Sequence, residues 1–592
     1  MNIDIGRRAL SAFPILRTCS ACCFQPRISA LVSPPPRLQA TTTTLPFRVV
    51  RTITSRSEQM TTPNPDHEHF FRYTSGRWLW DEEQQLRDRY RAFDVAELQS
   101  LAAKTVRSDS CISITKLAEG GYNKVFRLIM NDGKRVLARI PNPNAGPEFY
   151  STASEVATME LARDFLQIPV PRVFDWSATS NNAVGSEYII MEEASGTQLG
   201  LIWNQLSPDK KLSIMREIVT IESKMLAVSF SHFGSIYFAS DAVESAVPAL
   251  LTSESSSELK ERVYKKFSIG PTVDRSFWNK ERSSMQISRG PWRTPQEYAL
   301  SVGWRELEWI KSFAVPKPTS EATLISSAQN SPQAHLQLLE KYLKVAPALT
   351  DIDPVLTRPT LWHGDLHSSN LFIDDGHITA IIDWQGSWAG PLFLQSQPSP
   401  IVDYPGSILL QRPDNFDDLG PEQQAEIKQK IFKSTLYQLY LLETKERNPL
   451  LAKTFHLDHG KTRRLPIEFA GNTWDDDIVS FREALINVER HWQELGIQGE
   501  CPYHFTQDEL HSHSADAEGW NEVQDFFNSI EGLVKRDGWT YPDTFDSAFN
   551  FFSELRERGL KNMTGEEKRA FDRQTSWARK QGDSRAYGTS QH

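Results

Sequence analysis

Hydrophobic and polar residues alternate between residues 111 and 195 in a way that predicts a compact antiparallel sheet. Strands are expected at 111–117, 122–130, 135–140, 172–176 and 187–191. The turns between the first three are Glu119-Gly120-Gly121 and Asn131-Asp132-Gly133. Helical spacing at 152–165, bounded by Pro169, adds one helix to these five strands.

Helical spacing of apolar residues dominates the rest of the chain. It occurs at 81–104 and, after residue 196, at 206–226, 296–313, 335–344, 423–442, 477–495, 518–536, 544–558 and 565–579. Stretches rich in Ser, Thr and Pro at 252–260 and 314–334 predict exposed loops.

This pattern predicts an α+β protein in five parts. Residues 61–110 form an arm with helices, 111–195 a small lobe, 196–480 a large and mainly helical lobe, and 481–592 a C-terminal helical extension. The remaining part, residues 1–60, differs in composition from all of these.

The first 60 residues hold eight Arg, no Lys, and only Asp4 and Glu58 as acids, giving +6. The whole chain is −10, so the remainder is −16. A segment rich in Arg, Ser and Thr and poor in acids is typical of a mitochondrial transit peptide. We therefore expect a disordered leader at 1–60 and a mitochondrial location. A disordered basic tail is the alternative, and Met60 could start a shorter form.

Charge and composition exclude several other classes of protein. A body of −16 argues against general nucleic-acid binding, and no run of 18 apolar residues predicts a transmembrane helix. Only Cys111 and Cys501 lie outside the leader, too few for a disulfide framework. Cys501 with His504, His511 and His513 matches no standard zinc spacing, and we interpret these residues as a polar surface with a buried thiol.

The strongest chemical signal lies in residues 361–391, LWHGDLHSSNLFIDDGHITAIIDWQGSWAGP. Two short apolar runs, 371–373 and 378–382, flank the turn Asp374-Asp375-Gly376 and predict a β-hairpin. This hairpin would bring Asp383 beside Asn370.

Asp365 precedes the hairpin and would face the same point as Asn370 and Asp383. Mg²⁺ prefers a few oxygen ligands of this kind, with phosphate oxygens completing its shell. The hairpin therefore predicts a phosphoryl-transfer site.

The order H-G-D-x-x-x-x-N followed by I-I-D-W resembles the aminoglycoside phosphotransferase family, which shares the protein-kinase fold. The resemblance covers residues 111–391 and implies a two-lobed fold with ATP and Mg²⁺ as cofactors. It implies that Asp365 accepts the proton of an acceptor hydroxyl and that Asn370 and Asp383 hold Mg²⁺. His363 is expected to be structural.

In the small lobe, Arg139 takes the position of the kinase lysine that binds the ATP phosphates. Arg keeps its charge and can bind phosphate, although it is not equivalent to Lys. Glu155 resembles the helix glutamate that fixes this cation, and Glu160 is its rival. Gly120 and Gly121 lie where a phosphate-covering loop belongs, although their pattern is not G-x-G-x-x-G.

The segment 191–196 resembles the linker between the two lobes, whose main chain binds adenine; Glu192 and Ala194 are the residues concerned. Further stretches, including EGGYNKVF at 119–126 and TRRLPIEFAGNTWDDD at 462–477, resemble a group of mitochondrial proteins. That resemblance spans nearly the whole chain and implies a role in mitochondrial inheritance or maintenance.

These observations predict a mitochondrial phosphotransferase. We expect it to act on a small-molecule hydroxyl, or second on a protein, with no nucleic-acid partner. The alternative is a nucleotide-binding pseudokinase that serves as a scaffold, because Arg139 replaces the lysine and the glycine turn is atypical.

Overall fold

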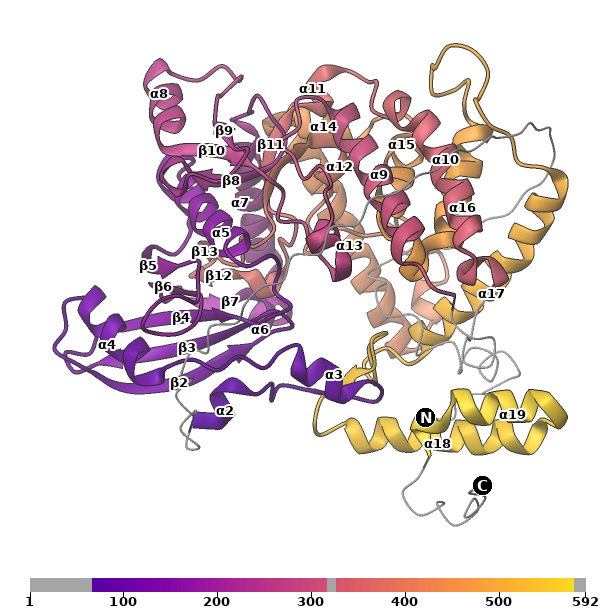
Figure 1. The fold of residues 1–592 in the computed structure, drawn as a ribbon, viewed down its shortest axis with the longest axis horizontal. Coiled ribbons are helices and arrows are strands. Elements are labelled where there is room, and N and C mark those ends of the chain that lie inside the picture. The colour runs from indigo at the N-terminus through magenta and orange to yellow at the C-terminus, as the bar shows by residue number, and fades with distance from the viewer. Residues whose placement is uncertain (1–66, 317–325, 580–592) are drawn as a thin grey trace, which may run out of the picture. The chain divides into compact units, whose positions relative to one another are not determined.

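The computed structural model describes residues 67–316 and 326–579 (Figure 1). The expected leader at 1–60 and part of the expected loop at 314–334 lie outside the described residues. The chain forms two compact units. The larger unit comprises Ala96–Phe313 and Tyr342–Gly471, and the smaller unit comprises the described residues of the ranges 1–95, 314–341 and 472–592.

A five-stranded antiparallel sheet begins the larger unit, in the order β2-β3-β4-β6-β5. Its strands are β2 (Cys111–Glu119), β3 (Asn123–Met130), β4 (Arg135–Pro141), β5 (Val173–Ser177) and β6 (Tyr188–Glu192). Along β3 every second side chain is buried, as expected of a strand with one face on a core. The five predicted strands are confirmed.

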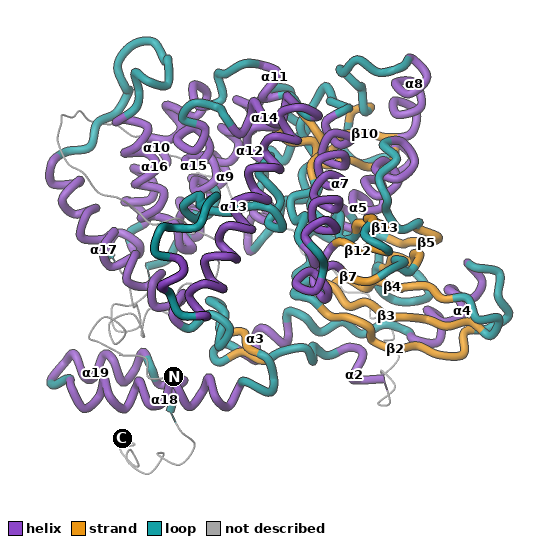
Figure 2. Tube along the Cα trace, turned by 180° about the vertical axis from the view of Figure 1, so that it is seen from behind, coloured by secondary structure: helices purple, strands orange, loops and turns teal. Residues whose placement is uncertain are grey.

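One helix, α5 (Tyr150–Glu160), packs between this sheet and β8 (Ser235–Phe238), as Figures 1 and 2 show. It continues as a π-helical turn, Leu161–Phe165. Nine consecutive side chains, from Ser151 to Met159, are buried. Small residues such as Ala153 and Ala157 allow this close packing on several faces.

The remainder of the larger unit is mainly helical and also carries short strands (Figure 2). Its helices are α4 (Val95–Thr105), α6 (Leu199–Ile202), α7 (Pro208–Leu226), α8 (Ser257–Lys266), α9 (Pro295–Phe313), α11 (Pro354–Thr357), α12 (Leu392–Gln395), α13 (Pro421–Arg447), α14 (Pro449–Phe455) and α15 (Gly460–Ala470). Helix α10 (Pro332–Leu349) crosses the boundary between the units.

Short strands in this part form small antiparallel sheets. β8 pairs with β10 (Phe267–Gly270), which also pairs with β9 (Val247–Pro248); β11 (Pro359–Trp362) pairs with β14 (Trp388–Pro391). β12 (Leu371–Asp374) lies between β13 (His377–Ile381) and β7 (Thr197–Gln198). Apolar residues of α5, α7 and these strands form one core, which includes Ile218, Phe267, Leu371 and Trp384.

The smaller unit has its own apolar core. Its elements are α2 (Glu68–Phe71), β1 (Arg77–Trp78), α3 (Glu82–Arg87), α16 (Ile478–Arg490), α17 (Gln507–Ser529), β15 (Trp539–Thr540), α18 (Phe545–Asn562) and α19 (Gly565–Gln574). Trp80, Phe527, Phe552 and Leu555 are buried together in its core. Among the described residues, no helix has the length and hydropathy needed to cross a membrane.

The helical spacing at 81–104 corresponds to two helices, α3 and α4, separated by the non-helical residues 88–94. One sequence-based prediction was wrong. The loop expected at 252–260 contains the start of α8, where Ser256 accepts a hydrogen bond from the Leu259 amide and caps the helix.

Candidate active site

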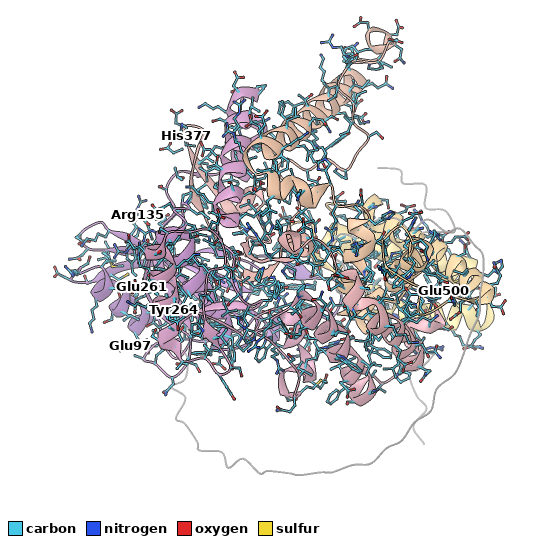
Figure 3. The ribbon with its side chains drawn as sticks, turned by 90° about the horizontal axis from the view of Figure 1, so that it is seen from above. Glu97, Arg135, Glu261, Tyr264, His377 and Glu500 are labelled. Carbon is cyan, nitrogen blue, oxygen red and sulfur yellow. The ribbon has the colours of Figure 1, made fainter. Side chains whose placement is uncertain are left out.

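The predicted hairpin is present. Asp375 and Gly376 have φ values of 45° and 87°, the left-handed backbone that a two-residue hairpin turn requires. His377, labelled in Figure 3, begins the returning strand β13. This confirms Asp374-Asp375-Gly376 as a turn.

Asp365 and Asn370 contact each other at the base of the hairpin, and Asp383 follows the residue that pairs with Asn370. The Ile382 amide donates to the Asn370 carbonyl at 3.0 Å, so Asn370 lies across from the residue that precedes Asp383. Asn370 Nδ2 donates to the Asp365 carbonyl at 2.9 Å and lies 3.4 Å from Asp365 Oδ2. With its NH₂ group used in this way, the Asn370 amide has its oxygen left to ligate a cation.

Asp383 has an unusual backbone. Its φ of 61° is left-handed, which is uncommon for a residue other than Gly and costs on the order of 1 kcal/mol or more. The Asp383 side chain is 43% exposed, so the energy cost of this backbone conformation is not offset by burying the side chain. Strain of this kind concentrates at functional sites.

His363 fixes the backbone beneath these residues. Its Nε2 lies 3.0 Å from the Ile382 carbonyl and its Nδ1 accepts from the Asp365 amide at 3.3 Å. These contacts select the neutral tautomer protonated at Nε2. Burial lowers the pKa of His363, which favours the same neutral form.

His367 was not recognised as a site residue from the sequence. Its Nδ1 accepts from the Ser369 amide at 3.1 Å, and its Nε2 lies 3.4 Å from Asp365 Oδ2. This contact is the main reason that the pKa of Asp365 is lowered and the pKa of His367 is raised. The available signal was a second His two residues after the Asp in H-G-D-L-H.

Arg139 and Glu155 form a buried ion pair between β4 and α5. Glu160 does not share this role, because it pairs with Lys266. Arg139 Nη1 also lies 3.9 Å from Asp383 Oδ1. Burial lowers the pKa of Arg139, and the charge of Asp383 opposes that shift.

Gln385 is a second residue that sequence reasoning missed. Its side-chain oxygen accepts from Arg139 Nη2 at 3.0 Å, two residues beyond Asp383. Nothing in the order of residues marks Gln385 apart from its position in I-I-D-W-Q.

Gly120 and Gly121 form the turn between β2 and β3, closed by a hydrogen bond from the Gly120 amide to the Asn123 carbonyl at 2.9 Å. A Cβ at either glycine would meet no atom within 4 Å, so the space beside the turn is open. The next residue, Tyr122, stacks on the guanidinium of Arg275, whose Cζ is 3.6 Å from the ring centroid.

The linker with Glu192 and Ala194 runs from β6 to β7. The Glu192 amide donates to the Arg172 carbonyl at 2.8 Å, so the sheet uses this N–H. After the linker, a Cβ at Gly196 would lie 2.4 Å from the Ile373 carbonyl oxygen. This close approach and a φ of 90° require glycine there and place the linker directly on β12.

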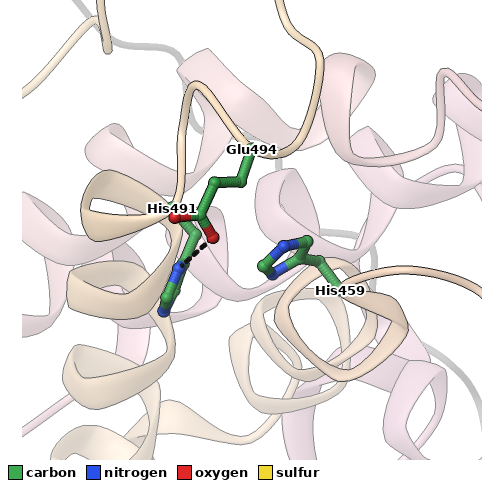
Figure 4. A group of neighbouring side chains, drawn as sticks. All are labelled: His459, His491 and Glu494. Atoms are coloured by element: carbon green, nitrogen blue, oxygen red, sulfur yellow. Dashed lines mark hydrogen bonds and ion pairs between the residues drawn. The ribbon is translucent and has the colours of Figure 1, made fainter.

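The histidines considered for zinc lie in the smaller unit and have separate partners. His504 pairs with Glu489 at 3.0 Å and His513 with Glu483 at 2.8 Å. Another pair, His491 Nδ1 and Glu494 Oε2, is 2.8 Å apart and is marked by the dashed line in Figure 4.

The donor groups of the hairpin suit Mg²⁺. The Asp383 carboxylate is partly exposed, and the Asn370 amide oxygen is free of the hydrogen bonds that occupy Nδ2. Both are hard oxygen ligands, and two protein ligands are few enough to leave positions for phosphate and water.

The chain is similar to several known proteins. The model of the phosphotransferase enzyme family matches residues 286–393, which include the hairpin. A subtelomeric hrmA-associated cluster protein of Aspergillus fumigatus is 33% identical over 495 residues, covering 76% of this chain and 94% of the relative.

Relatives named altered inheritance of mitochondria protein 9, mitochondrial, are also found. The Yarrowia lipolytica protein is 25% identical, covering 82% of this chain and 87% of the relative. The Saccharomyces cerevisiae protein is 23% identical, covering 83% and 90%. These relatives confirm the resemblance to a group of proteins named as mitochondrial.

A solved structure from Ralstonia eutropha, described as a putative aminoglycoside phosphotransferase, is 12% identical with a TM-score of 0.34. The aligned region covers 73% of this chain and 99% of the Ralstonia chain. The α+β architecture expected from the sequence is confirmed, with a five-stranded antiparallel sheet followed by a mainly helical part. Residues 286–393 thus carry the match to the phosphotransferase enzyme family, and the chain as a whole belongs to the same family as the subtelomeric hrmA-associated cluster protein of Aspergillus fumigatus.

Proposed function

We propose that this protein is an ATP- and Mg²⁺-dependent phosphotransferase of the mitochondrion that phosphorylates a hydroxyl group. The observation that carries the proposal is the position of Arg139. It is buried against Glu155 and lies 3.9 Å from Asp383, so one cation adjoins the candidate metal ligands. A buried, paired guanidinium beside a carboxylate suits the binding of a metal-bound phosphate chain.

Asp365 orients the acceptor hydroxyl and accepts its proton as the hydroxyl oxygen forms a bond to the γ-phosphorus. The bond from that phosphorus to the β–γ bridging oxygen breaks, and ADP leaves with the electron pair. The pKa of Asp365 is lowered by His367, which keeps the carboxylate ionised and able to hydrogen-bond the hydroxyl. Positioning and charge neutralisation, more than a strong base, supply the rate enhancement in such reactions.

Asn370 and Asp383 would hold Mg²⁺, which when bound neutralises charge on the phosphates. Arg139 binds the outer phosphates, and the main chain at Gly120 and Gly121 approaches them from the turn. The main chain of Glu192 and Ala194 contacts the adenine. All of these residues belong to the larger unit.

The acceptor is a small molecule with a free hydroxyl, and a protein hydroxyl is the second choice. The names of the mitochondrial relatives support a role for the reaction in mitochondrial inheritance or maintenance.

The experiment is a phosphorylation screen of a mitochondrial metabolite extract with γ-labelled ATP, comparing the intact protein with Asp365→Asn. We expect a labelled product that requires Mg²⁺ and is lost in the variant. Nucleotide binding without transfer, unchanged in Asp365→Asn, would contradict the proposal and select the pseudokinase scaffold instead.

A further inference from the structure

The side-chain amide of Gln385 makes three hydrogen bonds. Its Oε1 accepts from Arg139 Nη2 at 3.0 Å and from Asn123 Nδ2 at 2.9 Å. Its Nε2 donates to the Ala145 carbonyl at 2.8 Å. One glutamine therefore bonds three separate segments of the chain.

The orientation of this amide is determined by its partners. A guanidinium can only donate hydrogen bonds, and a main-chain carbonyl can only accept them. Gln385 Oε1 must therefore face Arg139, and Nε2 must face Ala145. Rotating the amide by 180° would place its NH₂ group against the Arg139 donor and its oxygen against the Ala145 carbonyl oxygen.

The three partners all belong to the part of the chain that carries the sheet. Asn123 is the first residue of β3, directly after the turn that contains Gly120 and Gly121. Arg139 lies in β4, and Ala145 lies between β4 and α5. Gln385 itself follows β13, in the segment that carries Asp383.

Asn123 depends strongly on this contact. Its Oδ1 is buried and has no hydrogen-bond partner among the described residues. The bond from the part-buried Asn123 Nδ2 to Gln385 is therefore the one that anchors this amide, and its loss would leave both polar atoms of the side chain without a partner among the described residues.

We propose that Gln385 is a positioning residue that couples the glycine turn to Arg139 and Asp383, so that phosphate and metal contacts form together when a nucleoside triphosphate binds. The proposal rests on the function proposed above. Gln385 touches neither the phosphates nor the metal; it holds Asn123 and Arg139, which adjoin them.

The test measures the affinity of the full-length protein for a fluorescent N-methylanthraniloyl ATP in the presence of Mg²⁺. Gln385→Met keeps the length of the side chain and removes all three hydrogen bonds, and Gln385→Ala is a second variant. We expect either change to weaken binding about tenfold, the effect of losing hydrogen bonds to a charged group.

Gln395→Ala is the matched control. Gln395 donates from Nε2 to the carbonyls of Thr360 and Gly390, and these bonds do not involve β3, β4 or α5. Its loss is expected to leave nucleotide affinity unchanged. A merely structural role for Gln385 predicts that Gln385→Met and Gln385→Ala both lower the free energy of unfolding and leave nucleotide affinity unchanged.

A double-mutant cycle of Asn123→Ala and Gln385→Met tests the coupling itself. We expect the double variant to bind no more weakly than the weaker single variant, since both remove the same contact. Additive losses, or wild-type affinity in Gln385→Met, overturn the proposal.

Asp383→Ala distinguishes this failure from that of the proposed function. If Asp383→Ala loses Mg²⁺-dependent binding while Gln385→Met binds normally, only the role of Gln385 is wrong. If both variants bind normally, the proposed function and the positioning role are both wrong.

Discussion

At the scale of single residues, the buried charge of Arg139 is balanced mainly by one partner, Glu155. Its side chain is 8% exposed and that of Glu155 is 3% exposed, so removing the carboxylate leaves a buried cation without its main partner. We expect Glu155→Ala to lower the free energy of unfolding by about 3–5 kcal/mol, the range for breaking a buried pair. Nucleotide affinity should fall as well. Urea denaturation and nucleotide titration measure the two effects.

Glu160, on the same stretch of chain, provides the control. Its pair with Lys266 is partly exposed, since the two side chains are 30% and 44% accessible. Glu160→Ala is expected to cost less than about 1 kcal/mol and to leave nucleotide affinity unchanged. Equal losses of unfolding free energy in Glu155→Ala and Glu160→Ala would show that burial does not make the Arg139 pair more stabilising than the exposed one.

A second residue, Glu222 of α7, is fully buried away from the site, and both of its carboxylate oxygens lie within hydrogen-bond distance of the Tyr440 hydroxyl of α13. Burial raises its pKa from 4.5 to about 8. The folded state therefore binds a proton that the unfolded state has released between these pH values.

Because the folded pKa of Glu222 lies above the unfolded one, its contribution to stability is complete below pH 4.5 and is lost as pH rises toward 8. The loss is on the order of a few kcal/mol. Glu222→Gln should flatten the dependence of unfolding free energy on pH over this interval, measured by denaturation at several pH values. A variant with the same slope as the wild type would contradict this explanation.

Sequence reasoning located the residues that a short motif brings together and missed those that only the folded chain brings together. Asp365, Asn370 and Asp383 lie within 19 positions, joined by a hairpin whose turn residues can be read directly. Gln385 contacts Asn123, which is 262 positions away in the sequence. Nothing in local spacing predicts such a contact.

At the scale of elements, the turn between β2 and β3 allows the role of its glycines to be tested. Neither Gly120 nor Gly121 is among the glycines with positive φ, and a Cβ at either would have open space. The fold itself therefore does not require glycine there. If phosphate lies beside this turn, side chains would obstruct it.

We expect the double variant Gly120→Val and Gly121→Val to change the free energy of unfolding by less than about 1 kcal/mol, because no atoms clash. Its affinity for Mg²⁺-nucleotide should fall at least tenfold. Gly196→Ala is the opposite case: its Cβ would lie 2.4 Å from a carbonyl oxygen at a φ of 90°, so stability should fall. Normal nucleotide affinity in the valine variant would exclude the turn from phosphate binding.

Some strands and helices were not predicted from the sequence, and each omission has a physical reason. β8 and β10 have four residues each, all buried, so they show no alternation of hydrophobic and polar positions. Helix α15 contains Pro466, which suggests a break when read from the sequence. The longer helices, such as α7 and α9, were predicted because their apolar spacing extends over five turns.

At the scale of the whole molecule, every residue assigned to the site belongs to the larger unit. The smaller unit combines the N-terminal arm with the C-terminal helices, a grouping that distant segments create only on folding. The expected limits at 110, 195 and 480 stay predictions. No local change of composition marks the boundary inside α10, because that helix continues through it.

The most direct test of the account is the effect of Mg²⁺ on nucleotide affinity in the wild-type protein and in Asp383→Ala. The exposed Asp383 carboxylate contributes little to folding, so the variant should fold and still bind nucleotide weakly through Arg139 and the linker. We predict that Mg²⁺ tightens binding at least tenfold in the wild type and has no effect in the variant. Equal Mg²⁺ dependence in both proteins would contradict the proposed metal site and the phosphotransferase that depends on it.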